Sequence, residues 1–187
     1  MTNRPARRWA GCAAFACFLW AAILVPSPLS AQSRDERSVR AAYIFNLIPY
    51  INWPPDKHEL LIGIVGSRAT GEMMQKMLNG KTTESRSLRI LLSPSNDELR
   101  GCSIVYFADS QKDNIPNLLG TLKNTEFLTV GDSDLFAQQG GMIGLVKDND
   151  HIQIEVNLDA TQRSGIRISS HVLNLARIVP PDARGRN

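Results

Sequence analysis

The sequence predicts an α/β fold: a single-domain layered sheet that is largely parallel, with a C-terminal antiparallel hairpin and flanking helices. Three observations support this prediction. Four short apolar runs alternate with segments of helical spacing, which is typical of parallel strands joined by helical crossovers. These runs are continuous rather than alternating, as in strands that are buried on both faces. Two later runs flank Asp148-Asn149-Asp150, a turn-forming tip that indicates a hairpin.

The first 31 residues are predicted to be a secretory signal peptide. Arg4, Arg7 and Arg8 are followed by a nearly unbroken apolar run over residues 9–25, and small Ala31 stands at the cut position. The apolar run is at the short edge of what spans a bilayer, so an uncleaved membrane anchor is the alternative. The prolines and small residues after the run favour cleavage. Residues 32–187 then form one domain.

The charge balance of the mature chain gives no electrostatic reason to bind nucleic acid. The chain has 187 residues, with 21 Lys and Arg against 18 Asp and Glu. Cleavage after residue 31 removes three of the basic residues and none of the acidic ones, so the two charges become equal. Affinity for nucleic acid depends on neutralising phosphates, and we therefore exclude this class of partner.

The first half of the mature domain is predicted to alternate between helices and strands. Apolar residues spaced by three and four predict a helix from Ser38 to Tyr50, which Pro54-Pro55 stops. Strands are predicted at residues 60–65, 88–93, 104–108 and 127–130. Between them we expect a helix over 69–79, a short segment over 94–101 that Ser95 could cap, and a helix over 113–124.

The pattern changes after Gly131. A short helix is predicted from Asp134 to Gln138, followed by hairpin arms at 142–147 and 151–158. The second arm alternates apolar and polar residues, which predicts one dry and one wet face. A closing helix is predicted from Ser169 or Ser170 to Val179. It should turn these apolar residues toward the core: Val172, Leu173, Leu175, Ala176 and Ile178.

No metal ion or other cofactor is predicted. His58, His151 and His171 are far apart in the sequence, and none occurs at a metal-ligand spacing. Only Cys102 remains after cleavage, so no internal disulfide can form. It precedes an apolar run, which favours a buried apolar role over the alternative of a reactive thiol.

Catalytic signals are weak. No Gly-x-Ser-x-Gly occurs, and Gly131-Asp132-Ser133 is only faintly similar to the Gly-Asp-Ser block of one lipase and esterase group. A helix cap is the favoured interpretation of this run, and a hydrolase that uses Ser133 with His171 is the least favoured function. The turn at Gly66-Ser67 could hold an anion through backbone N–H groups, but it lacks a nucleotide-binding signature.

The most distinctive segment is 165–177, which contains Arg167, His171 and Arg177 in an otherwise apolar setting. These three side chains could bind a carboxylate or phosphate, because Arg presents a planar fork of donors. Ordinary structural roles are the alternative. Arg177 would be favoured in the last turn of a helix, and Arg167 could pair with Glu155 or Asp159.

Three blocks, at residues 39–54, 128–143 and 154–170, resemble the YfiR family in order and over nearly the whole mature chain. The resemblance implies a small periplasmic α/β protein without catalysis. The best understood member of that family represses an inner-membrane diguanylate cyclase by contacting its periplasmic sensor domain, which lowers cyclic di-GMP output and biofilm formation. Some members are stabilised by disulfides, whereas this mature chain keeps only Cys102.

The leading functional hypothesis is therefore a periplasmic regulator, exported by a cleaved signal peptide. We expect a surface on the first or the final helix to dock on an inner-membrane sensor protein, either a diguanylate cyclase or a histidine kinase. Tyr43, Tyr50 and Trp53 are the candidate anchors, with core packing as the alternative. A periplasmic sensor of an anion or nucleotide at Arg167 and His171 is the second hypothesis. A homodimer is also compatible with the sequence.

Overall fold

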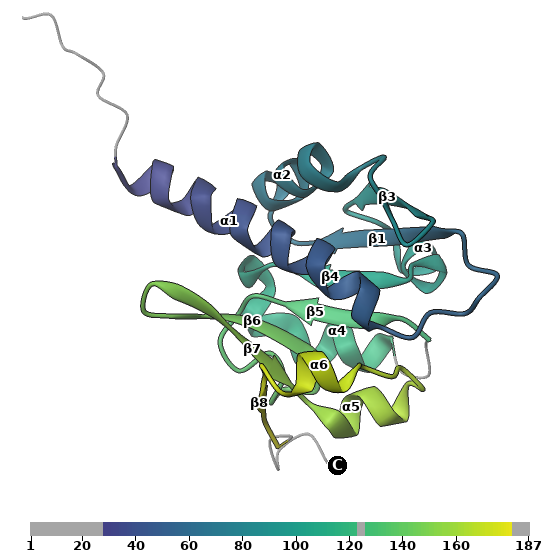
Figure 1. Cartoon of the computed structure of the whole chain (residues 1–187). Coiled ribbons are helices and arrows are strands. Elements are labelled where there is room, and N and C mark those ends of the chain that lie inside the picture. Colours follow the sequence, from purple (N-terminus) through teal and green to yellow (C-terminus); the bar gives the residue numbers. More distant parts are fainter. Residues whose placement is uncertain (1–27, 123–125, 181–187) are drawn as a thin grey trace, which may run out of the picture.

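Eight strands form one sheet in the computed structural model, which describes residues 28–122 and 126–180, with side chains from residue 36 onward. The strands are β1 (Glu59–Val65), β2 (Thr82–Thr83), β3 (Arg86–Leu92), β4 (Ile104–Phe107), β5 (Leu128–Gly131), β6 (Ile143–Asp148), β7 (His151–Val156) and β8 (Arg177–Ile178). Their order across the sheet is β2-β3-β1-β4-β5-β6-β7-β8 (Figure 1).

The middle of the sheet is parallel. β3, β1, β4, β5 and β6 run in one direction, and β7 returns antiparallel to β6. At the two edges, β2 pairs antiparallel with β3 and β8 pairs parallel with β7. Every residue of β4 and β5 is buried, as expected of parallel strands that are covered on both faces. The predicted α/β class, the largely parallel sheet and the C-terminal hairpin are confirmed.

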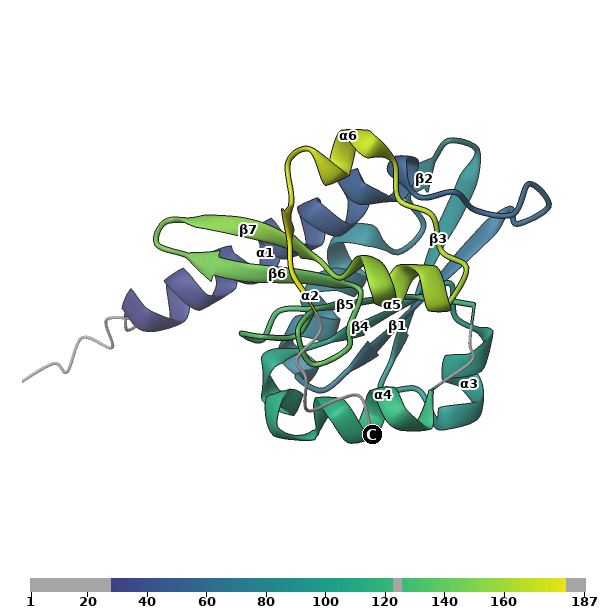
Figure 2. The same ribbon diagram turned by 90° about the horizontal axis from the view of Figure 1, so that it is seen from below.

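Helices cover both faces of this sheet. The α-helices are α1 (Pro28–Leu47), α2 (Arg68–Leu78), α3 (Asn96–Gly101), α4 (Ile115–Thr121), α5 (Leu158–Arg163) and α6 (Ser170–Leu173), and the 3-10 helices are η1 (Ile48–Tyr50) and η2 (Asp109–Asn114). α1, α2 and α6 lie on one face, whereas α3 and α4 lie on the other (Figure 2).

The core consists of two clusters, one on each face. Tyr106 and Phe107 are neighbours in β4, but Tyr106 belongs to the cluster under α1 and Phe107 to the cluster under α4. This separation follows from the alternation of side chains along a strand. Both side chains are fully buried.

α1 begins before the predicted start at Ser38. The residues before Ser38 are polar and carry no apolar stripe, so periodicity does not detect this part of the helix. Glu36 forms an ion pair with Arg40 one turn later, at 3.8 Å, and another with Lys147 of β6, which holds this turn against the sheet. α1 includes the last residues of the predicted signal peptide. Residues 1–27 lie outside the described residues, and cleavage stays a prediction.

The predicted closing helix is wrong beyond its first turn. α6 ends at Leu173, and the chain then becomes extended and forms β8 at the edge of the sheet. The backbone N–H of Val179 donates to Val156 O at 3.0 Å, so pairing with β7 replaces helical bonding there. Val172 is buried as predicted, but Leu175 is 67% exposed and Ile178 46% exposed. Apolar residues at helical spacing therefore did not imply a buried helical face.

The short helix predicted from Asp134 to Gln138 is also wrong, because these residues form turns. The reason is Phe136, whose ring fills the space over two glycines. A Cβ on Gly131 would lie 2.3 Å from this ring, and a Cβ on Gly141 would lie 2.1 Å from it. The loop wraps around the ring, with Leu135 at a φ of 63°, instead of continuing as a helix.

Two helix caps explain element boundaries near the sheet. The predicted strand over 151–158 ends at Val156, because the side chain of Asn157 accepts a hydrogen bond from Ala160 N at 3.0 Å and caps α5. The predicted cap at Ser95 is confirmed. Its hydroxyl accepts from Glu98 N, and the Glu98 carboxylate accepts from Ser95 N at 2.8 Å, which forms a capping box.

Candidate functional site

A surface depression of about 390 Å³ lies where three segments of the chain meet. The segments are residues 49–53, the β2–β3 turn with Glu84 and Arg86, and residues 167–169. Arg86 is the first residue of β3, so the depression lies at the amino ends of the parallel strands. Ligands of open α/β sheets more often bind at the opposite, carboxyl ends.

Backbone hydrogen bonds hold the first and third segments together. Asn52 N donates to Arg167 O at 3.0 Å, and Ser169 N donates to Tyr50 O at 2.8 Å, on either side of an antiparallel bridge between Ile51 and Ile168. The side chain of Ile51 is buried in the core and anchors this pairing. The C-terminal segment is thereby fixed to the end of α1.

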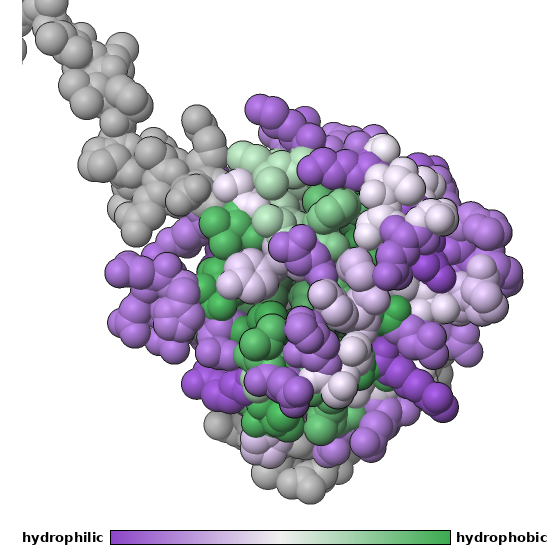
Figure 3. Space-filling view, in the orientation of Figure 1, coloured by the Kyte–Doolittle hydropathy of each residue, from purple (hydrophilic) through white to green (hydrophobic). Residues whose placement is uncertain are grey.

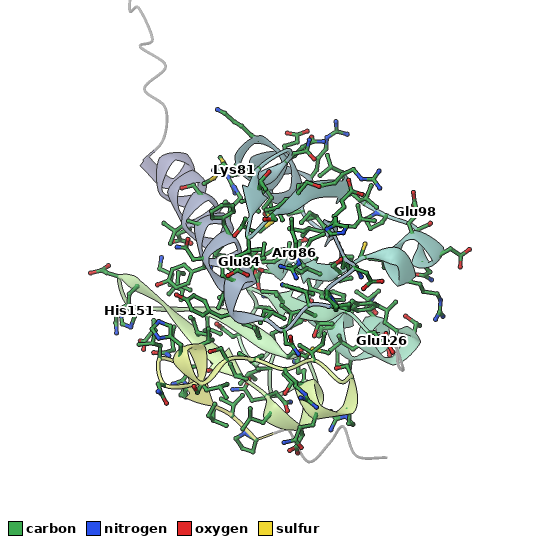
Figure 4. The ribbon with its side chains drawn as sticks, turned by 45° about the vertical axis from the view of Figure 1, so that its right-hand side comes forward. Lys81, Glu84, Arg86, Glu98, Glu126 and His151 are labelled. Atoms are coloured by element: carbon green, nitrogen blue, oxygen red, sulfur yellow. The ribbon has the colours of Figure 1, made fainter. Side chains whose placement is uncertain are left out.

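Arg86 is the less exposed of two arginines that line the depression. Its side chain is 19% exposed, its Nη1 lies 3.9 Å from the Glu84 carboxylate, and its Nε is buried without a hydrogen-bond partner. Glu84 and Ser85 form the tight turn before it, with φ values of 46° and 63°. Figure 4 shows Glu84 and Arg86 next to each other, far from His151 at the hairpin tip.

Arg167 faces the same depression from the C-terminal segment. It is exposed, and within the described part of the chain it forms no ion pair. Arg86 and Arg167 together offer guanidinium donors that suit a carboxylate or phosphate. Glu84 limits this attraction, because an anion that approaches Arg86 also approaches a like charge.

Of the three residues predicted to bind a ligand, the structure brings two near the depression and separates the third. Arg167 lines it, and His171 stacks on Tyr50, another lining residue, with ring centroids 4.9 Å apart. Arg177 instead pairs with Glu155 on the outer edge of the sheet. The sequence allowed a pair between Glu155 and Arg167, but the observed partner is Arg177.

Sequence reasoning missed Glu84 and Arg86. The run Thr82 to Arg86 contains no glycine or proline, and it was not interpreted as a turn. The polar Glu84-Ser85 pair before an apolar strand was the available signal for a turn. No local pattern indicates that this turn meets the segment around Arg167, because that contact depends on how the chain ends are placed.

The three candidate aromatic anchors have different environments. Trp53 is only 6% exposed and donates from Nε1 to Ile48 O at 2.9 Å, so it belongs to the core. Tyr43 is half-buried, and its hydroxyl donates to Ile152 O at 3.3 Å. Tyr50 is 39% exposed. Tyr43 and Tyr50 are therefore accessible to a partner, and Trp53 is not.

Apolar side chains gather on the face where α1 passes beside the β6–β7 hairpin and α6 (Figure 3). Val39 of α1 is 38% exposed, and Leu175 after α6 is 67% exposed. Tyr43 of α1 and Ile154 of β7 are partly buried and pack against the core cluster on this face. We call Val39, Tyr43, Ile154 and Leu175 the α1–β7 face.

The turn after β1, at Gly66-Ser67, is packed closely against the segment after β4. Gly66 follows β1 with a φ of 107°, and a Cβ there would lie 2.7 Å from Ser110 Oγ and 2.9 Å from Gln111 Cγ. The segment after β4 therefore leaves no room for a side chain at position 66. Ser67 caps α2 by accepting from Thr70 N at 3.4 Å.

Ser133 and His171 do not form a nucleophile–base pair. Ser133 is 1% exposed, and its hydroxyl is buried without a hydrogen-bond partner, whereas His171 lies exposed against Tyr50. Within residues 28–122 and 126–180, no three His, Cys, Asp or Glu side chains are grouped to hold a metal ion. Cys102 is buried, and this burial raises the pKa of its thiol.

A buried polar cluster connects α1 with the carboxyl end of the sheet. The Tyr106 hydroxyl donates to Asp132 Oδ2 at 2.7 Å, and Arg40 Nε lies 3.8 Å from the same oxygen. Asp132 Oδ1 is buried without a partner. Burial raises the pKa of Asp132 above its usual range, although the hydrogen bond from Tyr106 and the charge of Arg40 act in the opposite direction.

Comparison with known proteins identifies a family and a fold. The sequence model of the YfiR/HmsC-like family (DUF4154) matches residues 37–177. Among solved structures, the chain is similar to an ABC domain from Streptococcus pneumonia in complex with L-Trp, with a TM-score of 0.53 and 11% identity. It is also similar to a conserved domain protein from Vibrio cholerae, with a TM-score of 0.52 and 12% identity.

These two structural likenesses concern the fold alone. Each covers 76% of this chain, which corresponds to 62% of the Streptococcus chain and 59% of the Vibrio chain. The chain thus spans less than two thirds of either relative. Among its described helices, none combines the length and apolar character needed to cross a membrane.

Proposed function

The chain belongs to the YfiR/HmsC-like family, and we propose that it is a non-catalytic periplasmic regulator of an inner-membrane signalling protein. In this proposal it binds the periplasmic sensor domain of a diguanylate cyclase and lowers cyclic di-GMP output and biofilm formation. A membrane histidine kinase is the alternative partner. The observation that carries the proposal is the family match, which extends over residues 37–177.

The α1–β7 face is the proposed contact surface. Val39 and Leu175 leave apolar area in water, and the partly buried Tyr43 lies on the same face of α1 as Val39, four residues later. Contiguous exposed apolar area on a soluble protein commonly marks a binding surface. Tyr50 lies at the end of the same helix layer and extends the candidate contact, whereas Trp53 supports the fold from within.

A gene deletion combined with a cyclic di-GMP reporter tests this function. Deletion should raise reporter output, and the wild-type gene should restore it. Val39→Asp should fail to restore it, because a charge in the α1–β7 face opposes burial there. Leu92→Asp is the matched control, since Leu92 is also 38% exposed but ends β3 beside α2. Unchanged output after deletion would remove the cyclase from the proposal.

A periplasmic anion sensor is the second candidate function. The specific observation in its favour is the buried, unpartnered Nε of Arg86 beside a depression that Arg167 also lines. A bound carboxylate or phosphate would give this nitrogen a partner. Ligand binding could regulate docking only if the ligand prefers the docked or the undocked form.

Isothermal titration with nucleoside monophosphates and amino acids tests the sensor. Wild-type protein should release heat with at least one of these ligands, and Arg167→Ala should weaken that binding at least tenfold. Arg163→Ala is the control, because Arg163 is an exposed arginine on α5 that does not line the depression. Equal binding by wild type and Arg167→Ala would remove the assigned site.

A further inference from the structure

Glu155 is a buried carboxylate beside the outer edge of the sheet, and its counter-charge comes from a very short strand. Its side chain is 2% exposed, and one oxygen accepts a hydrogen bond from Arg177 Nη2. The other oxygen, Oε2, is buried without a partner. Gly144 lies opposite Glu155 on β6. A buried carboxylate without a paired cation is strongly unfavourable.

β8 supplies this cation, but it is held by few contacts. It contains two residues, which pair with Glu155 and Val156, and the next residue adds one backbone bond to β7, from Val179 N to Val156 O at 3.0 Å. Arg177 is 57% exposed, and its neighbour Ile178 is 46% exposed. Figure 1 shows β8 at the outer edge of the sheet, beside β7. Short edge strands with exposed apolar residues are weakly attached.

Side chains cover the rest of the β7 edge. Ile152 O accepts a hydrogen bond from the Tyr43 hydroxyl at 3.3 Å, and Ile154 O accepts one from Gln153 Nε2 at 3.0 Å. Both bonds come from side chains and not from the backbone of a further strand. The β7 edge is therefore a template for an extended segment, with a fixed requirement for positive charge at Glu155.

We propose that the β7 edge at Glu155 receives an extended segment of the protein partner, in which an Arg or Lys lies between apolar residues and replaces Arg177. This inference deepens the proposed regulatory function. Residues 175–179, Leu-Ala-Arg-Ile-Val, occupy the position of that segment within this chain. The charge requirement selects the partner, because a strand without a basic residue would leave Glu155 buried and unpaired.

Peptide binding to the purified protein tests the proposal. The probe is a fluorescein-labelled peptide, Leu-Ala-Arg-Ile-Val, followed by fluorescence anisotropy. Arg177→Ala should bind this peptide at least tenfold more tightly than wild type, because the internal competitor is weakened. A peptide with norleucine in place of Arg should bind Arg177→Ala at least tenfold more weakly. Arg163→Ala should behave as wild type.

Ile178→Ser keeps the test decisive if Arg177→Ala does not fold, because it weakens β8 and leaves the pair between Arg177 and Glu155 in place. It should also bind the Arg peptide more tightly than wild type. Equal binding of the Arg and norleucine peptides, or no peptide binding by either variant, would overturn the proposal. A wild-type dimer that is lost in Ile178→Ser would assign the edge to a second copy instead. Peptide binding does not depend on the cyclic di-GMP reporter, so this inference and the proposed function can fail separately.

Discussion

Asp132 is the residue at which pH is expected to act most directly on the folded state. It faces Arg40 from α1, Tyr106 from β4 and Asp109 from the segment after β4. Burial raises the pKa of Asp132, so the folded protein binds a proton at a pH at which the unfolded chain has already released it. This residue therefore lowers stability as the pH rises through its folded pKa, and acidification relieves the effect.

The first prediction concerns the pH dependence of unfolding. As the pH falls from 7.5 toward 4.5, the free energy of unfolding of the wild type should rise relative to that of Asp132→Asn, which cannot ionise. Urea denaturation of both proteins across this window measures the difference. Glu36 has a lowered pKa through its hydrogen bond with Lys147, and its stabilising effect is lost only below this window. A constant difference between the two proteins would show that Asp132 does not titrate there.

A second prediction concerns Tyr50 and Trp53, which the sequence analysis both named as candidate anchors for a partner. Trp53→Ala should cost about 3–5 kcal/mol of stability, because it removes a buried ring and its hydrogen bond to Ile48 O. Tyr50→Ala should change stability far less, because Tyr50 is 39% exposed and stacks only on His171. Thermal unfolding of both variants makes the comparison. Equal losses would contradict the assignment of Trp53 to the core and Tyr50 to the surface.

Single residues also show where sequence reasoning stops. Arg167 was predicted to be a ligand-binding residue, and it does line the depression, although binding there stays a prediction. Arg86 was not predicted to be a site residue, because the evidence for it is a buried Nε without a hydrogen-bond partner, which no local sequence pattern indicates. Arg177 was grouped with Arg167 and His171 as a ligand-binding candidate because the three are close in the sequence. The pairing of β8 with β7 instead brings Arg177 to Glu155.

At the scale of an element, the loop between β5 and β6 depends on two glycines that accommodate one ring. Gly131→Ala should destabilise the protein by about 1–3 kcal/mol, because its Cβ would meet the Phe136 ring at 2.3 Å. Urea unfolding measures this loss. Gly120→Ala is the matched control, since Gly120 lies inside α4 with open space around it. The control should be neutral or slightly stabilising, because alanine favours a helix.

A double variant tests whether contact with the Phe136 ring causes the loss of stability in Gly131→Ala. Combining Gly131→Ala with Phe136→Leu should cost less than the sum of the two separate changes, because the smaller side chain makes room for the new methyl group. Additive losses would show that Gly131 is required for its backbone conformation rather than for contact with the ring. In that case the loop would not be wrapped around Phe136 for the reason given above.

The elements that were predicted correctly are those whose residues carry local information. The strands at β1, β3, β4 and β5 contain continuous apolar runs, and Ser95 stands three residues before Glu98, as a capping box requires. The elements that were missed depend on distant contacts. β8 forms because the chain pairs with β7 at Val156, and the turns after β5 form because the Phe136 ring packs against Gly131 and Gly141. Neither cause is visible in a window of neighbouring residues.

At the scale of the whole molecule, the C-terminal segment connects the two regions discussed above. Residues 167–169 bond to residues 50–52 at the depression, and residues 177–179 bond to β7 at Glu155. Between these two attachments, Val172 is buried while Leu175 is exposed. A ligand at Arg167 and a partner at Glu155 would therefore act on the same short segment, which gives a direct physical route for coupling between them.

Amide hydrogen exchange tests this connection. Residues 165–179 should exchange faster than β1 and β4, because most of their backbone bonds close local turns and β8 pairs on one side only, whereas β1 has a paired strand on each side. A nucleoside monophosphate or amino acid that binds the wild type in titration should slow exchange in 165–169, and coupling predicts that 175–179 also slow. Arg167→Ala with the same compound is the control and should show neither change. Slowing confined to 165–169 would mean that ligand and partner act independently, because the segment would then not transmit the constraint to the β7 edge.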